Sequence, residues 1–420
     1  MDKFVVKGGN KLNGKVKISG AKNASLALIP ATLLAPGIYN LANTPNLRDV
    51  WTMSRLMMAL GAFCELNHNT LFIDTTNVNS VTAPYDYVKM MRASFYVLGP
   101  LTARYGEARV SLPGGCAWGP RPVDLHLKVM EALGAEITLE GGYIISKAER
   151  LHGARFHFDI SSVGATGNAV MAAVLAKGSS IFTNSAAEPE ITHLCRTLVK
   201  MGAKIEGVGT DTLEIEGVDD LKAVNFDNIP DRIEAATFLI AAAMTGGHIE
   251  ITGVNPYHFA AVIAKLEQAG CEIDCISDRI ILDAPNGITP VDLITAPYPG
   301  LPTDIQPVWT AFMTTAAGHS KIIDNIYKDR FKHVPELTRM GAMIDVVENT
   351  AIVEGNHQLK GAAVMATDLR AGAAMVLAGL TAEGTTDVHR IYHIDRGYED
   401  FEKKLSSLGA DIKREKTDLI

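Results

Sequence analysis

Apolar residues fall into two kinds of helix-like segment, separated by short strand-like runs. Segments of the first kind are apolar on every side, as in KNASLALIPATLLAPG, DRIEAATFLIAAAMTGG and RAGAAMVLAGLTAEG. A helix without a polar face is buried all round, so these segments predict core helices. Segments of the second kind are amphipathic, as in LHLKVMEALG and FAAVIAKLEQAG, and predict helices that cover a core.

Both kinds of segment recur six times along the chain. The phrase that ends each amphipathic helix contains a glycine, at Gly61, Gly134, Gly202, Gly270, Gly341 and Gly409. These glycines stand where a helix C-terminus favours left-handed backbone. Their spacing of about 70 residues predicts six units, each with one buried helix, one amphipathic helix and several strands.

Six units of this size do not share one core easily, because single hydrophobic cores stop growing at about 250–300 residues. We therefore expect two α/β domains of three units each. The alternative is an open solenoid of six repeats. It is less favoured because solenoid repeats usually run to about 20–50 residues.

Charge, hydropathy and cysteine content argue against a nucleic-acid-binding, membrane-inserted or secreted protein. The chain has 39 Lys and Arg against 47 Asp and Glu, a net charge of −8, so no nucleic-acid partner is expected. The apolar runs are shorter than the roughly 18 residues of a membrane span, which predicts no membrane insertion. No secretory signal is recognised, and five scattered cysteines favour reduced thiols in the cytoplasm.

The residues at the front of the buried helices recur in phase with the repeat, and most of them are charged. They are Lys22, Arg92, Gly164, Asp231, Asp304 and Arg370. The two aspartates fit ordinary helix caps and first-turn charges, whereas cations at a helix N-terminus oppose its dipole. We expect a bound anion to compensate them. The hypothesis is that three helix starts meet at one end of each domain and face a cleft between the domains.

One glycine-rich segment, SLPGGCAWGPRPVDLH, interrupts the repeat and predicts an exposed thiol at Cys116. The other cysteines, Cys64, Cys195, Cys271 and Cys275, are interpreted as core residues. The segment HRIYHIDR at 389–396 is interpreted as a strand, which argues against a zinc site there. No phosphate-loop or dinucleotide motif is present, and no metal or cofactor is expected.

Ten segments in order carry a resemblance to a known family. They are SGAKNA, APYDYVKMMRAS, SLPGGC with RPVDLH, SVGAT, EPEI, PDRIE, PTDIQ, HVPELTRMGA, MATDLRA and RIYHIDRGYE. With them the chain resembles the UDP-N-acetylglucosamine 1-carboxyvinyltransferases, a family of enolpyruvyl transferases. The resemblance implies two inside-out α/β barrel domains with pseudo-threefold symmetry, one of residues 22–229 and one of residues 1–21 and 230–420. It places the active site in the cleft between them.

The resemblance also implies a reaction and its partners. The enolpyruvyl group of phosphoenolpyruvate passes to the 3′-hydroxyl of UDP-N-acetylglucosamine, phosphate is released, and peptidoglycan synthesis begins. Cys116 matches the general acid, which also forms a covalent adduct, and Asp304 matches the base. The phosphoenolpyruvate site matches Lys22, Asn23, Arg121, Arg370 and Arg396, of which Lys22 and Arg396 are also expected to act in catalysis.

The UDP-sugar site implied by the resemblance draws on several segments. It comprises Arg92, Arg121, Pro122, Val123, Asp124, Leu125, Ser161, Ser162, Val163, Gly164, Asp304 and Ile326, with Asp231 and Arg330 in support. Ile160 and Tyr327 depart from relatives that carry Lys and Phe there. Two alternatives stay open: the shikimate-pathway enolpyruvyl transferase and a non-catalytic sugar-nucleotide sensor. The sequence leaves the oligomeric state undecided.

Overall fold

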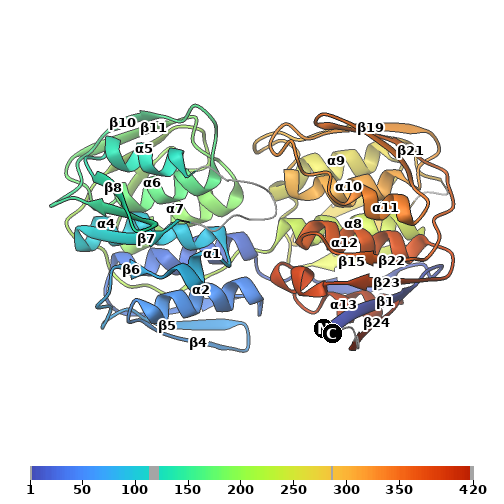
Figure 1. The fold of residues 1–420 in the computed structure, drawn as a ribbon, viewed down its shortest axis with the longest axis horizontal. Helices are drawn as coiled ribbons and strands as arrows, with labels where there is room; N and C mark the ends of the chain where they lie inside the picture. The colour runs from blue at the N-terminus through green and yellow to red at the C-terminus, as the bar shows by residue number, and fades with distance from the viewer. Residues whose placement is uncertain (1, 113–122, 285–286, 417–420) are drawn as a thin grey trace. The chain divides into compact units, whose positions relative to one another are not determined.

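The computed structural model describes residues 2–112, 123–284 and 287–416 (Figure 1). The chain divides into two compact units. We call Gly20–Ile229 the central unit, and Met1–Ser19 with Pro230–Ile420 the terminal unit. Each described unit contains three four-stranded sheets. The fold is therefore mixed α/β, with the sixfold repeat divided three and three.

The central unit has three buried helices and three amphipathic ones. The buried helices are α1 (Lys22–Ala31), α4 (Leu98–Tyr105) and α6 (Val163–Ala173), and the amphipathic helices are α2 (Arg48–Ala59), α5 (Asp124–Ala132) and α7 (Pro189–Met201). Short helices are η1 (Thr32–Leu34), α3 (Tyr85–Val88) and η2 (Arg92–Val97).

The strands of the central unit form three sheets of one design. In order across each sheet, they are β14 (Phe226–Asp227), β3 (Ile38–Ala42), β5 (Thr70–Asp74) and β4 (Phe63–Asn67); β6 (Thr82–Ala83), β7 (Glu107–Ser111), β9 (Tyr143–Lys147) and β8 (Glu136–Glu140); and β10 (Arg155–His157), β11 (Ser179–Thr183), β13 (Leu213–Glu216) and β12 (Lys204–Glu206). The first pair in each sheet is parallel and the other two pairs are antiparallel.

The terminal unit repeats this plan. Its buried helices are α8 (Arg232–Thr245), α10 (Gln306–Met313) and α12 (Leu369–Thr381), and its other helices are α9 (Ala260–Gln268), α11 (Val334–Arg339), α13 (Phe401–Ser407), η3 (Pro256–Phe259), η4 (Thr303–Ile305) and η5 (Ile391–Arg396). Its sheets run β2 (Asn13–Lys17), β15 (His248–Thr252), β17 (Arg279–Asp283), β16 (Glu272–Ile276); β18 (Leu293–Ile294), β19 (His319–Ile323), β21 (Thr350–Glu354), β20 (Met343–Val347); and β22 (Ala363–Met365), β23 (Thr385–His389), β1 (Asp2–Lys7), β24 (Asp411–Lys416).

Both units close on themselves through strands that are distant in sequence. In the central unit β14 pairs with β3, although almost the whole unit separates them along the chain. In the terminal unit β1 pairs with β24, and β2 pairs with β15. The first strands of the chain therefore complete two sheets of the terminal unit before the chain enters the central unit.

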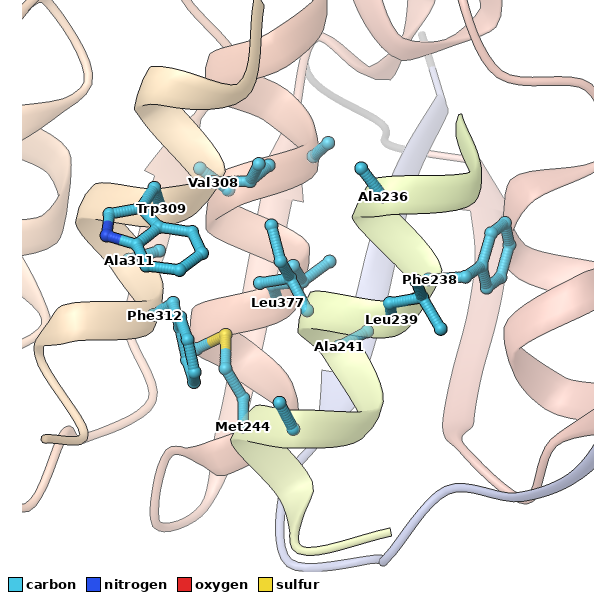
Figure 2. Packing of buried hydrophobic residues seen from close by; sticks show 14 of the residues in the cluster. Ala236, Phe238, Leu239, Ala241, Met244, Val308, Trp309, Ala311, Phe312 and Leu377 are labelled. Carbon is cyan, nitrogen blue, oxygen red and sulfur yellow. The ribbon is translucent and has the colours of Figure 1, made fainter. Parts of the chain in front are cut away.

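The apolar helices form the core of each unit, as the pattern predicts. In the terminal unit α8, α10 and α12 pack against one another, with Trp309, Phe312 and Leu377 in the core that they form, whereas Phe238 points from α8 toward α13 (Figure 2). Each of these four residues is fully buried. A separate cluster fills the central unit. The sheets lie outside these helices, the inside-out arrangement that we expected.

The local differences from the sequence-based prediction have physical explanations. Two of the core helices begin with 3-10 turns, η2 and η4. The segment at 389–396, interpreted as a strand, leaves β23 at His389 and continues as η5. Arg390 has a left-handed backbone with φ of 58°, which breaks the extended run. The interpretation of Cys275 as a core residue is also wrong, because its side chain is exposed on β16, whereas Cys64, Cys195 and Cys271 are buried.

Candidate active site

Asp304 is held between two arginines in the terminal unit. Its Oδ2 accepts hydrogen bonds from Arg370 Nε at 3.1 Å and Nη2 at 3.0 Å, and its Oδ1 pairs with Arg330 Nη1 at 2.8 Å. The side chain of Asp304 is 26% exposed, whereas Arg370 is fully buried. The carboxylate is therefore fixed in direction while one side of it remains open to solvent.

Arg370 lies in a pocket of aromatic and acidic groups. Its guanidinium carbon lies 5.0 Å from the centroid of the Tyr398 ring. Burial alone would lower the pKa of Arg370, but Tyr398, Asp304 and Asp231 reverse that effect and raise it. Its Nη1 is buried without a hydrogen-bond partner among the described residues. One buried N–H group of a permanent cation is thus left for another acceptor.

The three core-helix starts of the terminal unit meet around Arg370. Asp231 caps α8, with its side chain accepting from the N–H groups of Ile233 and Glu234 at 2.9 and 3.0 Å. Asp368 caps α12 and accepts from the N–H of Arg370 at 2.8 Å. Asp304 stands in the first turn of η4, as predicted for an acidic residue at a helix start, and its carboxylate also pairs with Arg330 and Arg370.

A buried carboxylate organises the loop beside Asp304. Asp324 accepts hydrogen bonds from Thr295 Oγ1 at 2.8 Å, Thr303 Oγ1 at 2.7 Å, Ile326 N at 3.0 Å and Tyr327 N at 2.8 Å. Arg330 Nη1 also donates to Thr303 Oγ1 at 3.0 Å. The network fixes Ile326, which is 45% exposed, and Arg330 on the segment next to Asp304.

Arg396 ends η5, which packs on α12. Its side chain is partly exposed. The neighbouring Tyr398 is buried, and its hydroxyl lies 2.9 Å from Thr237 Oγ1 on α8. The terminal unit therefore brings together Asp231, Asp304, Arg330 and Arg370, with Arg396 on an adjoining segment.

Lys22 begins α1 in the central unit and is compensated within the protein. Its Nζ lies 3.3 Å from Asp49 Oδ2, and the side chains of both residues are nearly buried. Asn23 follows on the same turn and is partly exposed. A bound anion is thus not required to explain a cation at this helix start, contrary to our expectation.

Arg92, His126 and the start of α6 gather at another part of the central unit. A Cβ built on Gly164 would lie 3.0 Å from His126 Cε1, so only glycine lets the imidazole lie this close. The hydroxyl of Tyr96 donates to the carbonyl of Val163 at 3.4 Å. Burial lowers the pKa of His126 to about 3, and the charge of Arg92 adds to that effect.

A buried amide fixes the tautomer of His126. Asn168 Oδ1 accepts from Gly99 N at 2.8 Å, so its Nδ2 is the donor, to Phe95 O at 3.0 Å and to His126 Nδ1 at 2.8 Å. The Nδ1 atom is consequently an acceptor, and the neutral ring carries its proton on Nε2. That nitrogen lies against Gly164, 3.1 Å from the built Cβ.

The other residues expected at the UDP-sugar site occupy two helix starts of the central unit. Val123 and Asp124 begin α5, with Asp124 exposed and Leu125 partly buried. Ser162 caps α6, accepting from Ala165 N at 3.3 Å, and Ser161 and Val163 flank it. Ile160, directly before them, is 70% exposed.

Three predicted site residues, Cys116, Arg121 and Pro122, lie outside the described residues. Asp304 and Ile326 belong to the terminal unit, and their meeting with the sugar-site residues of the central unit stays a prediction. The described part of the chain holds no cluster of His, Cys, Asp or Glu suited to a metal ion. Across the same residues, no helix has both the length and the apolar character needed to span a bilayer.

Sequence reasoning missed Asp49, Asp324, Asp368, Asn168 and Tyr398. Asp368 carries a local signal, because an aspartate two residues before the first arginine of an apolar helix is typical of a cap. The pairing of Asp49 with Lys22 joins residues that are 27 positions apart, and no short motif reports it.

Comparison with known proteins agrees with this arrangement. The sequence model of the EPSP synthase (3-phosphoshikimate 1-carboxyvinyltransferase) family matches residues 6–405. The UDP-N-acetylglucosamine 1-carboxyvinyltransferase of Chlorobium chlorochromatii (strain CaD3) is 57% identical over 99% of both chains. The protein of that name from Chloroherpeton thalassium (strain ATCC 35110 / GB-78) is 54% identical over 100% of this chain and 98% of its own.

Solved structures show the same fold. The enolpyruvyl transferase NikO from Streptomyces tendae superposes with a TM-score of 0.89 at 26% identity, covering 98% of each chain. An EPSP synthase from Acinetobacter baumannii has a TM-score of 0.77 at 20% identity, over 99% of this chain and 100% of its own, a likeness in fold alone. The fold described above is that of the enolpyruvyl transferases. Within that class, the chain belongs to the UDP-N-acetylglucosamine 1-carboxyvinyltransferase family.

Proposed function

We propose that the protein transfers the enolpyruvyl group of phosphoenolpyruvate to the 3′-hydroxyl of UDP-N-acetylglucosamine and releases phosphate, the reaction that opens peptidoglycan synthesis. The proposal rests on its relatives' names and on one structural observation. That observation is the Asp304 carboxylate, held by Arg330 and by the buried Arg370, whose Nη1 has no acceptor within residues 2–112, 123–284 and 287–416. An anionic substrate would supply that acceptor.

The residues divide between the two substrates. Arg370, Arg396, Lys22, Asn23 and Arg121 bind phosphoenolpyruvate, whose phosphate and carboxylate are both anionic. The UDP-sugar binds at the α5 and α6 starts, through residues 121–125, 161–164 and Arg92, with Ile326 and Asp304 from the terminal unit. Backbone N–H groups at a helix start suit a diphosphate.

The reaction needs one acid and one base. The Cys116 thiol gives a proton to C3 of phosphoenolpyruvate, while the sugar oxygen attacks C2 and passes its own proton to Asp304. The Cys116 thiolate then takes a proton back from C3, which expels phosphate and restores the double bond. Asp304 suits the role of base because its carboxylate is held in place by its partners yet remains partly exposed. When the sugar oxygen does not attack, the thiolate left after C3 is protonated can add to C2 instead and form the covalent adduct.

The shikimate-pathway alternative is less well supported. The EPSP synthase structures are 20–21% identical to this chain, whereas the curated UDP-N-acetylglucosamine 1-carboxyvinyltransferases reach 57%. The sensor alternative has the same fold and would bind both ligands without reaction. We also propose a cytoplasmic location, which suits the free thiols among the described cysteines.

Phosphate release tests the proposed function. The protein should release phosphate only when phosphoenolpyruvate and UDP-N-acetylglucosamine are both present, and omission of either should abolish release. Shikimate 3-phosphate in place of the UDP-sugar should give none. The Cys116→Ser variant should lose at least 100-fold in kcat, in line with removal of a general acid, while it melts like the wild type. Binding of both ligands by a wild-type protein that releases no phosphate would identify a sensor instead.

A further inference from the structure

A buried polar network surrounds Ser19, the last residue of the terminal unit before the chain enters the central unit. The Ser19 N–H donates to Glu234 Oε2 at 3.0 Å, and its carbonyl accepts from Asp231 N at 2.9 Å. Its hydroxyl donates to Glu399 Oε2 at 2.6 Å and accepts from Lys404 Nζ at 2.6 Å. Every polar group of Ser19 is therefore engaged by another part of the terminal unit.

Glu234 and Lys404 hold this network together. Glu234 lies in the first turn of α8 and is 2% exposed. Its Oε1 accepts from Lys404 Nζ, so one lysine on α13 bridges α8 and Ser19. Burial raises the pKa of Glu234 to about 7, with Lys404 opposing and Asp231 adding to the rise. The lysine therefore helps to keep the buried carboxylate charged near neutral pH.

Ser19 has little chain between it and the proposed substrate residues. Only Gly20 and Ala21 separate it from Lys22. Gly20 packs directly against the backbone of Asn43, because a Cβ there would lie 1.7 Å from Asn43 O. Ala21 is held by hydrogen bonds from its N–H to Ile229 O at 2.7 Å and from Asn228 Nδ2 to its carbonyl at 2.9 Å. A displacement of Ser19 would consequently reach the start of α1.

The same network holds the segment of Arg396. Glu399, the partner of the Ser19 hydroxyl, follows Arg396 by three residues. Between them, Tyr398 is fixed by Thr237 and lies against Arg370. Ser19 is thus connected on one side to Lys22 by two residues of chain and on the other to the Arg396 segment by a hydrogen bond.

From this geometry we infer that Glu234, Lys404 and Ser19 are positioning residues for phosphoenolpyruvate. They act through Lys22 and the Arg396 segment and touch neither substrate. The inference rests on the proposed function. It identifies a role for a buried ion pair that the proposed chemistry does not use.

Steady-state kinetics on Ser19→Ala and Lys404→Met test the inference. Each variant should raise KM for phosphoenolpyruvate roughly tenfold, the effect of losing one buried charge-assisted hydrogen bond. KM for UDP-N-acetylglucosamine should change less than twofold, because the proposed sugar residues at the α5 and α6 starts lie in other repeats. Lys403→Met is the matched control: Lys403 is the next residue, but it is exposed and pairs with Asp400. It should leave both KM values unchanged.

A double variant separates positioning from stability. Lys404→Met leaves the buried Glu234 without its cation, which lowers the melting temperature. Adding Glu234→Gln removes that unpaired charge and should restore most of the melting temperature, while KM for phosphoenolpyruvate stays high. Recovery of KM together with stability, or equal changes in both KM values, would contradict the inference. A wild-type protein that releases no phosphate would refute the proposed function instead; the network would then be tested by calorimetric titration of phosphoenolpyruvate alone.

Discussion

The two arginines that share Asp304 differ in their surroundings. Arg370 is fully buried and lies against Tyr398, whereas the Arg330 side chain is 12% exposed and also binds Thr303. The protein interior solvates a charge poorly. Removing one partner of a buried ion pair therefore leaves the other charge uncompensated, which destabilises the fold. If Arg330 is replaced, the Asp304 carboxylate keeps a charged partner, since Arg370 still donates two hydrogen bonds to it.

We therefore expect Arg370→Leu to lower the free energy of unfolding by about 3–5 kcal/mol. Arg330→Leu should cost less, because its site is nearer to water and Asp304 keeps Arg370. Arg279→Leu is the control, since Arg279 pairs with Glu250 at an exposed site of the same unit and should cost less than about 1 kcal/mol. Urea unfolding of the three variants measures the order. A cost for Arg370→Leu no larger than that for Arg279→Leu would contradict the buried pairing.

Single residues could be predicted from sequence where a motif or helix start identifies them. Lys22, Arg92, Asp231, Asp304 and Arg370 all stand at core-helix starts, as expected. Their partners could not be predicted, because these lie tens of residues away in the chain, in the same repeat or in another. Asp304 and Arg370 are 66 positions apart in the chain, and only the fold brings them within hydrogen-bond distance.

At the scale of elements, α12 and η5 pack closely together at Gly372, which has no side chain to separate them. A Cβ built on Gly372 would lie 2.6 Å from Ile394 Cγ1 and 2.9 Å from Ala366 Cβ. Gly379, on the same helix, leaves slightly more room: its built Cβ would lie 3.2 Å from Thr386 Cβ. Small residues on α12 thus allow η5, which carries Arg396, to pack close to the core.

Gly372→Ala should destabilise the protein by about 1–2 kcal/mol, because overpacking outweighs the gain of roughly 1 kcal/mol in helix propensity. It should also raise KM for phosphoenolpyruvate, since η5 must move. Gly379→Ala gains the same propensity with a milder clash and serves as the control, expected within about 0.5 kcal/mol of the wild type. Thermal melting and kinetics on both variants measure these effects. A Gly372→Ala variant more stable than Gly379→Ala would show that the contact with η5 is loose.

Helices whose hydrophobic residues recur with one clear period could be predicted from the sequence. Elements whose course depends on the backbone conformation of one residue could not. The apolar pattern gave α8 and α12 correctly, and the glycines after the amphipathic helices all have positive φ, from 91° to 113°. The η5 segment was mistaken for a strand because its apolar and polar residues alternate. A left-handed Arg390 ends the extended run there, and neither periodicity nor propensity reports that conformation.

At the scale of the whole molecule, the repeat predicts the number of sheets but not how the chain closes them. The β1 strand, from the start of the chain, lies between β23 and β24, so the last repeat is completed by residues nearly 400 positions away. The β2 strand similarly completes the sheet of β15. A repeat in the sequence shows which segments are alike. It does not show which of the repeated strands pair with one another in a sheet.

Each unit also buries one neutral histidine, His126 in the central unit and His333 in the terminal unit. Both units should therefore lose stability in acid. Burial lowers the pKa of His126 in the central unit and of His333 in the terminal unit, each from 6.5 to about 3. As pH falls below about 6.5, the unfolded chain therefore takes up these protons before the folded one, and stability is lost. Glu234 acts in the opposite sense: its pKa is raised from 4.5 to about 7, so its contribution is lost as pH rises through that range.

Between pH 6.5 and 4.5 the two histidines together should outweigh Glu234, and the wild type should lose stability as pH falls. His126→Gln and His333→Gln should each remove about 2–3 kcal/mol of that loss. Glu234→Gln should make the loss steeper, since it removes the one opposing group of the three. The exposed His157→Gln variant is the control and should follow the wild type. Urea unfolding at intervals of half a pH unit gives the slope of the free energy of unfolding against pH. Equal slopes for His126→Gln and the wild type would mean that the imidazole takes up a proton inside the folded protein. That result would contradict the tautomer that Asn168 imposes.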